Sequence, residues 1–156
     1  MAFRCDESGN MNFWLAVANE VNCDLLAKMG HPYYALAGKG SKYALQAAPG
    51  DQCILYRAGK NSGFIGAFEI VSAAREKPVK LTGSWRPFAI QLPWKPIVLS
   101  PAHPVRVVPL VPDLEFVKSK SNYGMALRSN FRPLSKHDFD RIFSLLSEKA
   151  AKTTAG

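Results

Sequence analysis

The spacing of prolines in the second half of the chain limits the kind of sheet that it can form. Six of the 11 prolines fall within 20 residues, at Pro93, Pro96, Pro101, Pro104, Pro109 and Pro112. Proline cannot donate a backbone hydrogen bond to a neighbouring strand, so strands that contain it lie at sheet edges or at bends. We therefore expect a sheet that curls into a small barrel.

Apolar runs predict the strands of this sheet, at residues 13–18, 53–56, 64–71 and 88–92. A Gly-Lys-Asn-Ser-Gly loop separates the second run from the third, which indicates a hairpin. Asn22 is expected to cap a short helix that ends at Gly30, and Ser41 a helical turn through Ala48. This order of elements predicts an α+β fold with about five to six strands.

The C-terminal helix is the clearest element in the sequence. Ser135 is expected to cap it, and Asp138 completes a start that is similar to a capping box. Phe139, Ile142, Phe143 and Leu146 have the spacing of one core-facing stripe. We expect a flexible leader over residues 1–11, one domain over 12–147 and a linker-like tail over 148–156. Such a tail is typical of a module joined to a further effector domain.

Composition and cysteine usage indicate one globular domain. The chain has 156 residues, 47% of them hydrophobic and 21% charged, which is enough for a real core. The three cysteines have no close pairing, and Cys23 and Cys53 are expected to be reduced core residues. No signal peptide and no apolar run of membrane-spanning length are present in the sequence, so we expect a cytoplasmic monomer.

The positive charge is concentrated in the second half of the chain. The formal net charge is +8, and residues 79–156 contribute 12 lysines and arginines against five acids. No acid occurs from Lys77 to Pro112 or from Lys118 to Lys136. These stretches are either solvated faces or a track that follows a nucleic-acid backbone.

Aromatic residues lie next to this basic, acid-poor sequence. Trp14 lies in the first apolar run, Tyr33 and Tyr34 precede a Gly-Lys-Gly-Ser turn, and Trp85 precedes Arg86. Flat rings flanked by cations suit a protein that stacks on a nucleobase and holds its phosphates. Each ring has a structural alternative as a core residue.

The turn over residues 38–41 precedes an expected helix start, where free N–H groups could hold a phosphate. The alternative is an ordinary turn, and the sequence lacks the upstream glycine of a P-loop. Asn19 is expected to present its amide to a base edge or to cap a strand end. The residues expected to contact phosphates or the backbone are Lys39, Ser41, Lys42, Arg86, Lys120, Arg128 and Arg132. For Arg128 and Arg132 the alternative is pairing with Asp138 and Asp140.

Four stretches, in this order, resemble the EVE family, which belongs to the PUA-like superfamily together with the YTH readers. They are an aromatic-Trp-Leu run, a Pro-Gly-Asp entry into a strand, a Gly-X-X-Glu strand, and a Leu-Arg pair before a Ser-X-X-Asp-Phe helix. Their positions are residues 13–20, 49–56, 64–71 and 127–142.

The resemblance implies a PUA-like barrel whose mouth holds a flipped, often modified base in an aromatic cage. By position it places Trp14 near the pocket floor, Tyr33 or Tyr34 at the first wall and Trp85 at the second. YTH domains usually have tryptophan at the first wall, and the tyrosine here leaves the identity of the base open.

Signals for catalysis are weak. His31, His103 and His137 are scattered, and no Cys or His spacing suits zinc, so we expect no catalytic residue, metal or cofactor. The sequence predicts a domain that reads a modified base in DNA, as in a modification-dependent restriction system, where a nuclease would be a fused or associated partner. The alternatives are a domain that binds modified RNA, an ASCH-like enzyme acting on a nucleoside or RNA, and a basic protein-interaction module.

Overall fold

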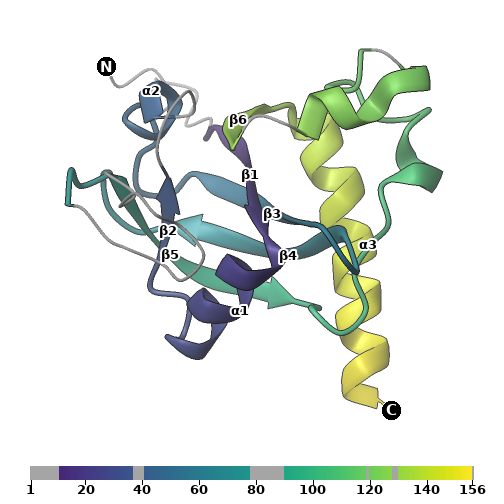
Figure 1. Ribbon diagram of the computed structural model, residues 1–156, viewed down its shortest axis with the longest axis horizontal. Coiled ribbons are helices and arrows are strands. Elements are labelled where there is room, and N and C mark those ends of the chain that lie inside the picture. The colour runs from purple at the N-terminus through teal and green to yellow at the C-terminus, as the bar shows by residue number, and fades with distance from the viewer. Residues whose placement is uncertain (1–10, 37–40, 78–89, 119, 128–129, 156) are drawn as a thin grey trace.

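A computed structural model describes residues 11–36, 41–77, 90–118, 120–127 and 130–155. Six strands form one curled sheet in the order β2-β5-β4-β3-β1-β6 (Figure 1). β1 (Phe13–Asn19) runs parallel to β3 (Gln52–Ala58), and every other neighbouring pair is antiparallel. The other strands are β2 (Tyr33–Leu36), β4 (Gly63–Ile70), β5 (Ile90–Leu99) and β6 (Phe131–Leu134). The predicted α+β class, the curled sheet and the hairpin of β3 and β4 are confirmed.

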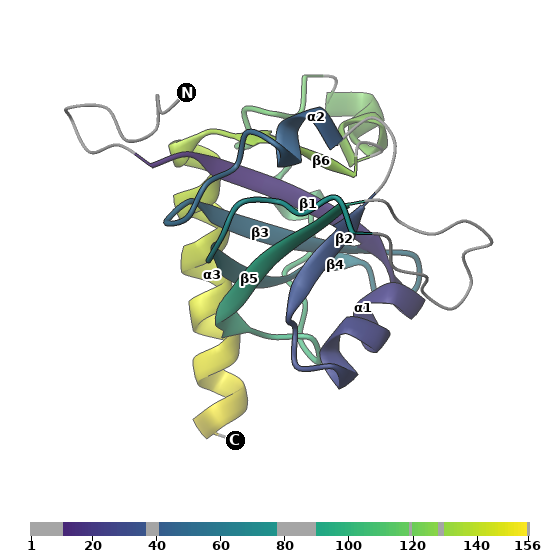
Figure 2. The same ribbon diagram turned by 90° about the vertical axis from the view of Figure 1, so that its left-hand side faces the viewer.

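Helices cover the sheet on opposite sides. α1 (Glu20–Lys28) follows β1 directly, and α3 (Lys136–Ala155) closes the chain. Figure 2 shows α3 along one side of the curled sheet and α1 on the other. The shorter elements are α2 (Ser41–Ala44) and the 3-10 helices η3 (Val108–Leu110) and η4 (Lys120–Leu127).

Strand alternation divides the core into two clusters. Trp14 and Ala16 of β1 belong to an inner cluster with β2 and β5, whereas Leu15 between them belongs to an outer cluster beneath α3. Successive side chains on a strand point to opposite faces, which explains the division. Both clusters are apolar, so the sheet is buried on both faces.

The turn at Pro49-Gly50-Asp51 anchors the inner cluster. Gly50 has a φ of +95°, a conformation that favours glycine. The Asp51 carboxylate is 1% exposed and accepts hydrogen bonds from the indole Nε1 of Trp14 at 3.0 Å and from the backbone N–H of Asn12 at 3.2 Å and Ala48 at 3.0 Å. One carboxylate therefore joins the start of β1, the core indole and the turn before β3.

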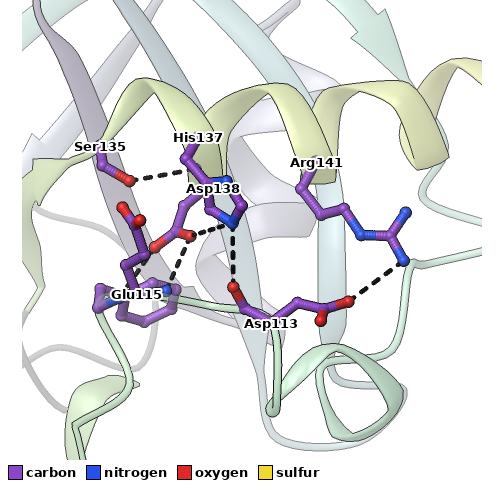
Figure 3. Close-up of polar contacts among 7 residues, drawn as sticks. Asp113, Glu115, Ser135, His137, Asp138 and Arg141 are labelled. Atoms are coloured by element: carbon purple, nitrogen blue, oxygen red, sulfur yellow. Dashed lines mark hydrogen bonds and ion pairs between the residues drawn. The ribbon is translucent and has the colours of Figure 1, made fainter.

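A second buried carboxylate fixes the start of α3 (Figure 3). Ser135 Oγ accepts the N–H of Asp138, so the predicted cap is confirmed. The Asp138 carboxylate, at 0% exposure, accepts the N–H groups of Glu115 at 2.8 Å and Phe116 at 2.9 Å. Asp138 thus clamps a distant segment to the helix, which differs from the reciprocal bond of a capping box.

The predicted core stripe of α3 is confirmed, since Phe139, Ile142 and Leu146 are buried in the outer cluster and Phe143 packs against it. α3 continues to Ala155, so residues 148–155 are helical although the sequence predicted a linker-like tail.

Two local predictions differ from the structure. Asn22 was expected to cap the first helix, but Asn19 caps it by accepting the N–H of Asn22 at 2.8 Å. β2 and β6 have four residues each and were not predicted as strands, because such short segments carry little periodicity.

Cys23 and Cys53 are buried and not disulfide-bonded, as predicted. Burial raises the pKa of the Cys23 thiol to about 12 and also raises the pKa of Cys53. Both therefore remain protonated near neutral pH, as structural thiols do.

Candidate nucleic-acid interface

The sheet closes through a side chain instead of a strand pair. β2 and β6 are its two edges, and within the described residues β2 pairs with β5 and β6 with residues 13–16 of β1. The hydroxyl of Tyr34 on β2 lies 2.6 Å from the carbonyl oxygen of Val17 and 2.5 Å from that of Asn130. We call this junction of Tyr34, Val17, Asn130 and the end of β1 at Asn19 the seam.

The end of β2 and the start of β5 adjoin each other, and several predicted site residues lie close to them in the sequence. Leu36, the last residue of β2, pairs with Ile90, the first residue of β5. The chain therefore leaves β2 towards Lys39 and enters β5 from Trp85 and Arg86 at adjoining positions. Arg128 lies two residues before Asn130. Lys39, Trp85, Arg86 and Arg128 themselves lie outside the described residues.

Trp14 lies in the inner cluster with 3% exposure. Its ring stacks on Phe131 with centroids 5.2 Å apart, and Tyr43 lies 6.3 Å away at a tilt. Because its Nε1 is bonded to Asp51, both the ring and its polar atom have protein partners. In this conformation Trp14 supports the seam from inside.

Tyr33 and Tyr34 point to opposite faces of β2, as alternation requires. Tyr34 is 1% exposed and packs against Trp94 and Phe131, and burial raises the pKa of its hydroxyl. Tyr33 is half-buried. Of the two tyrosines, Tyr33 is the one with ring surface left for a ligand.

The predicted basic residues divide into two groups. Lys42, the residue after Ser41 at the start of α2, is exposed, with its Nζ 5.0 Å from the ring centroid of Tyr43 in the inner region. Arg132 lies over Phe116 of the outer cluster at 5.3 Å and donates to the carbonyl of Ala126 at 3.4 Å. The structure therefore places Arg132 away from the seam, near η4, which begins at Lys120.

The acids suggested as alternative partners of Arg132 have other contacts. Asp138 accepts backbone N–H groups, and Asp140 pairs with Lys136 at 2.6 Å. Arg141 pairs with Asp113 at 3.4 Å (Figure 3). Arg132 is held by its local stack and the Ala126 carbonyl.

Asn22 is a polar residue near the seam whose position sequence reasoning missed. It lies in the first turn of α1, three residues after Asn19, and is 8% exposed. No residue in the described part of the chain donates to its Oδ1. A buried acceptor without a donor costs free energy unless a ligand or water supplies one. The sequence gives no signal for this, because the burial of Asn22 depends on how α1 packs.

His31 combines a strained backbone with a buried ring nitrogen. Its φ is +54°, and its ring lies 5.3 Å from that of Phe68. Within the described residues its Nδ1 is buried without a partner, and burial lowers its pKa below the ordinary 6.5. Protonation of His31 therefore favours the unfolded chain.

This lowered pKa predicts a pH-dependent stability. The contribution of neutral His31 to the unfolding free energy is fully present above pH 6.5 and is lost as the pH falls below that value, because the unfolded chain binds the proton more readily. Urea unfolding between pH 5 and 7.5 should show a smaller loss on acidification for His31→Phe than for the unchanged protein. His103→Gln, which alters an exposed histidine, serves as the control, and equal losses for all three proteins would contradict the assignment.

Two further observations concern chemistry and location. The described residues contain no group of three or more His, Cys, Asp or Glu side chains that could hold a metal ion. No helix in the same part of the structure is long and apolar enough to cross a membrane.

Comparison with known proteins adds relatives and fold neighbours. A UPF0310 protein of Pyrococcus abyssi is 25% identical over 147 residues, covering 87% of this chain and 100% of that protein. The YTH domain of Mmi1, solved as a complex with RNA, superposes with a TM-score of 0.66 at 11% identity, covering 94% of this chain and 87% of that one. Human THYN1, solved in complex with 5-methylcytosine containing DNA, superposes with a TM-score of 0.52 at 14% identity, covering 86% of this chain and 96% of that one.

The solved structures share the curled-sheet fold with this chain at low identity. The EVE domain model matches residues 12–145, most of the chain and all six strands. The resemblance seen in the sequence is thereby confirmed, and the chain belongs to the EVE domain family.

Proposed function

We propose that this protein binds a modified base, flipped out of DNA or RNA, at the seam of its curled sheet. The observation that carries the proposal is the seam itself, where the hydroxyl of Tyr34 contacts the carbonyls of Val17 and Asn130, which lie two residues from Asn19 and Arg128 in the sequence. The net charge of +8 favours a polyanionic partner. The Mmi1 and THYN1 complexes support a nucleic-acid ligand for this fold.

The proposed recognition combines stacking with hydrogen bonds to the base edge. Trp85 would form a wall of the cage, and Trp14 and Tyr34 would support it as a rigid floor. Tyr33, on the opposite face of β2 from Tyr34, would stack on the nucleic acid outside this floor. Removing a base from a duplex costs a few kcal/mol, and stacking returns about 1–3 kcal/mol per base. The amides of Asn19 and Asn22 would read the edge, and the unpartnered Oδ1 of Asn22 suits the exocyclic amino group of cytosine or adenine.

We propose that backbone contacts come from polar and basic residues near the ends of β2, β5 and β6 in the sequence. This phosphate track consists of Lys39, Ser41, Lys42, Arg86 and Arg128. Lys120 and Arg132 would contribute only where a longer nucleic acid passes the outer cluster. Binding should therefore weaken steeply with salt.

We favour DNA as the ligand, with this chain serving as the specificity module of a modification-dependent restriction system. Modified RNA is the second candidate. Complexes with each nucleic acid are found among the fold neighbours. An enzyme of the ASCH type would instead need Lys, Glu and Thr or Ser side chains that converge at the mouth of the barrel.

Fluorescence anisotropy with matched oligonucleotides tests the proposal. The panel carries cytosine, 5-methylcytosine, 5-hydroxymethylcytosine, adenine or 6-methyladenine, as DNA and as RNA, at two salt concentrations. We expect at least a tenfold preference for one modified base, equivalent to ~1.4 kcal/mol, and its loss in Trp85→Ala. Lys39→Ala should lower the slope of log affinity against log salt by about 1, whereas Lys60→Ala, at an exposed lysine of the β3–β4 loop, should leave the slope unchanged.

Three results would count against the proposal. Binding without preference would leave a general nucleic-acid module. An unchanged preference in Trp85→Ala would refute the assigned wall. No binding in any arm would favour the protein-partner alternative, or the enzyme if incubation changed the nucleoside.

A further inference from the structure

Trp94 lies in the middle of the inner cluster with its ring covered on both flanks. It is 3% exposed. Phe68 of β4 stacks on it at 3.9 Å with 14° between the planes, and Tyr34 of β2 stacks on it at 5.4 Å with 30°. β4 and β2 are the two strands that pair with β5. Trp94 therefore has no ring face to offer a base, and only its edge remains.

The polar atom on that edge has no partner. No acceptor among the described residues reaches Trp94 Nε1, although the atom is buried. Buried indole N–H groups usually find an acceptor, and one left without an acceptor carries its full desolvation cost. Phenylalanine would fill the same stack without this cost.

Trp14 shows how the same fold treats a structural indole. It lies in the same cluster, at the same 3% exposure, and donates to Asp51 at 3.0 Å. Within the described part of the chain, Trp14 thus has an acceptor for its indole N–H and Trp94 has none. Among the described residues the donor of Trp94 is therefore left for an acceptor that a ligand would bring.

Trp94 packs against a residue of the seam. Tyr34, which covers one flank of Trp94, carries the hydroxyl that bridges Val17 and Asn130. The indole N–H lies in the plane of its ring, so it points past the stacked rings and not at them. Trp94 is one aromatic layer away from the seam.

We infer that Trp94 Nε1–H donates a hydrogen bond to the bound base and thereby determines specificity. The partner is an acceptor on the base, either a keto oxygen or an unprotonated ring nitrogen. Trp94 would act through its donor, unlike the cage walls, which act by stacking. This inference rests on the proposed function and adds a polar contact to it.

Nuclear magnetic resonance of the indole groups tests the inference directly. The chain has three tryptophans, so a ¹⁵N-labelled sample gives three indole signals, and Trp94→Phe identifies one of them. The probes are 12-nucleotide DNA and RNA strands with one 5-methylcytosine or one 6-methyladenine, and their unmodified counterparts. The Trp94 signal should move downfield with the preferred strand, as expected when an unbonded N–H gains an acceptor, and should stay in place with the unmodified counterpart, which is the control.

The affinity of Trp94→Phe provides the second readout. We expect about a tenfold loss for the preferred strand, the usual effect of deleting one buried hydrogen bond, with little change for the unmodified strand. Either of two results overturns the inference, even where the other readout agrees. One is an unchanged affinity in Trp94→Phe, and the other is a Trp94 signal that does not move when the preferred strand is added. An internal water bonded to Trp94 Nε1 would give the second result. If Trp94→Phe does not fold, Trp14→Phe and Trp85→Phe identify the other two indole signals, and the remaining signal in the unchanged protein decides.

Failure of the proposed function gives a different result. If the unchanged protein binds no strand, or binds all strands equally, the base-reading proposal fails together with the inference. If the protein prefers a modified strand and Trp94 is unaffected, the proposal stands and only the role of Trp94 is lost.

Discussion

Replacing Asp51 with alanine is expected to lower the unfolding free energy by about 3 kcal/mol. The carboxylate is buried and accepts three hydrogen bonds, from Trp14 Nε1 and from the N–H groups of Asn12 and Ala48. Alanine removes all three acceptor contacts and leaves the indole N–H of Trp14 buried and unpaired. Hydrogen bonds to a charged group contribute about 1.5–3 kcal/mol each, and their losses overlap because they share one acceptor.

Urea unfolding at pH 7 measures this change through the midpoint. Asp24→Ala is the matched control, because Asp24 is an exposed aspartate of α1, and we expect it to stay within about 0.5 kcal/mol of the unchanged protein. Asp51→Asn should lie between the two, since its amide oxygen still accepts. A loss below about 1 kcal/mol for Asp51→Ala would show that the carboxylate does not hold this corner of the fold.

Local sequence signals predicted the elements that local interactions specify. The Pro-Gly-Asp turn, the hairpin of β3 and β4, and the stripe of α3 each depend on residues close together in the chain. β2 and β6 depend on distant partners, at residues 90–93 of β5 and 13–16 of β1. Because pairing over such distances leaves little trace in a four-residue segment, these strands were visible only in three dimensions.

The same difference applies to the candidate site. The family resemblance located the segments that meet at the seam, but it did not assign the contacts of individual side chains. Asn19 caps α1 because its side-chain oxygen accepts the N–H of Asn22. Arg132 packs on Phe116 because successive side chains of β6 point to opposite faces of the sheet. Whether Asn22 Oδ1 and Trp94 Nε1 have hydrogen-bond partners depends on the residues that surround them in the fold. Residue spacing in the sequence does not predict these neighbours.

The seam is held differently from the strand pairs of the sheet. Two paired strands are joined by a ladder of backbone hydrogen bonds. At the seam, the Tyr34 hydroxyl instead joins β2 to the carbonyls of Val17 and Asn130. The buried carboxylates lie elsewhere, at the turn before β3 and at the start of α3.

Asp138→Ala should lower the unfolding free energy by about 3 kcal/mol while sparing ligand binding. The side chain is fully buried and accepts the N–H groups of Glu115 and Phe116, so its loss leaves two backbone donors unpaired and removes a favourable negative charge from the first turn of α3. Asp140→Ala is the matched control two residues later, because Asp140 is exposed and only pairs with Lys136, and exposed pairs contribute little.

Urea midpoints and oligonucleotide affinity, measured on the same samples well below the unfolding transition, separate the two roles. We expect Asp138→Ala to shift the midpoint strongly and to keep the affinity of the unchanged protein, because its contacts lie in the outer cluster, on the face opposite to Tyr34. Asp140→Ala should change neither quantity. If Asp138→Ala lost affinity at full folding, the segment after Phe116, which leads to Lys118 and Lys120, would belong to the binding surface, and the nucleic acid would contact both faces of the sheet.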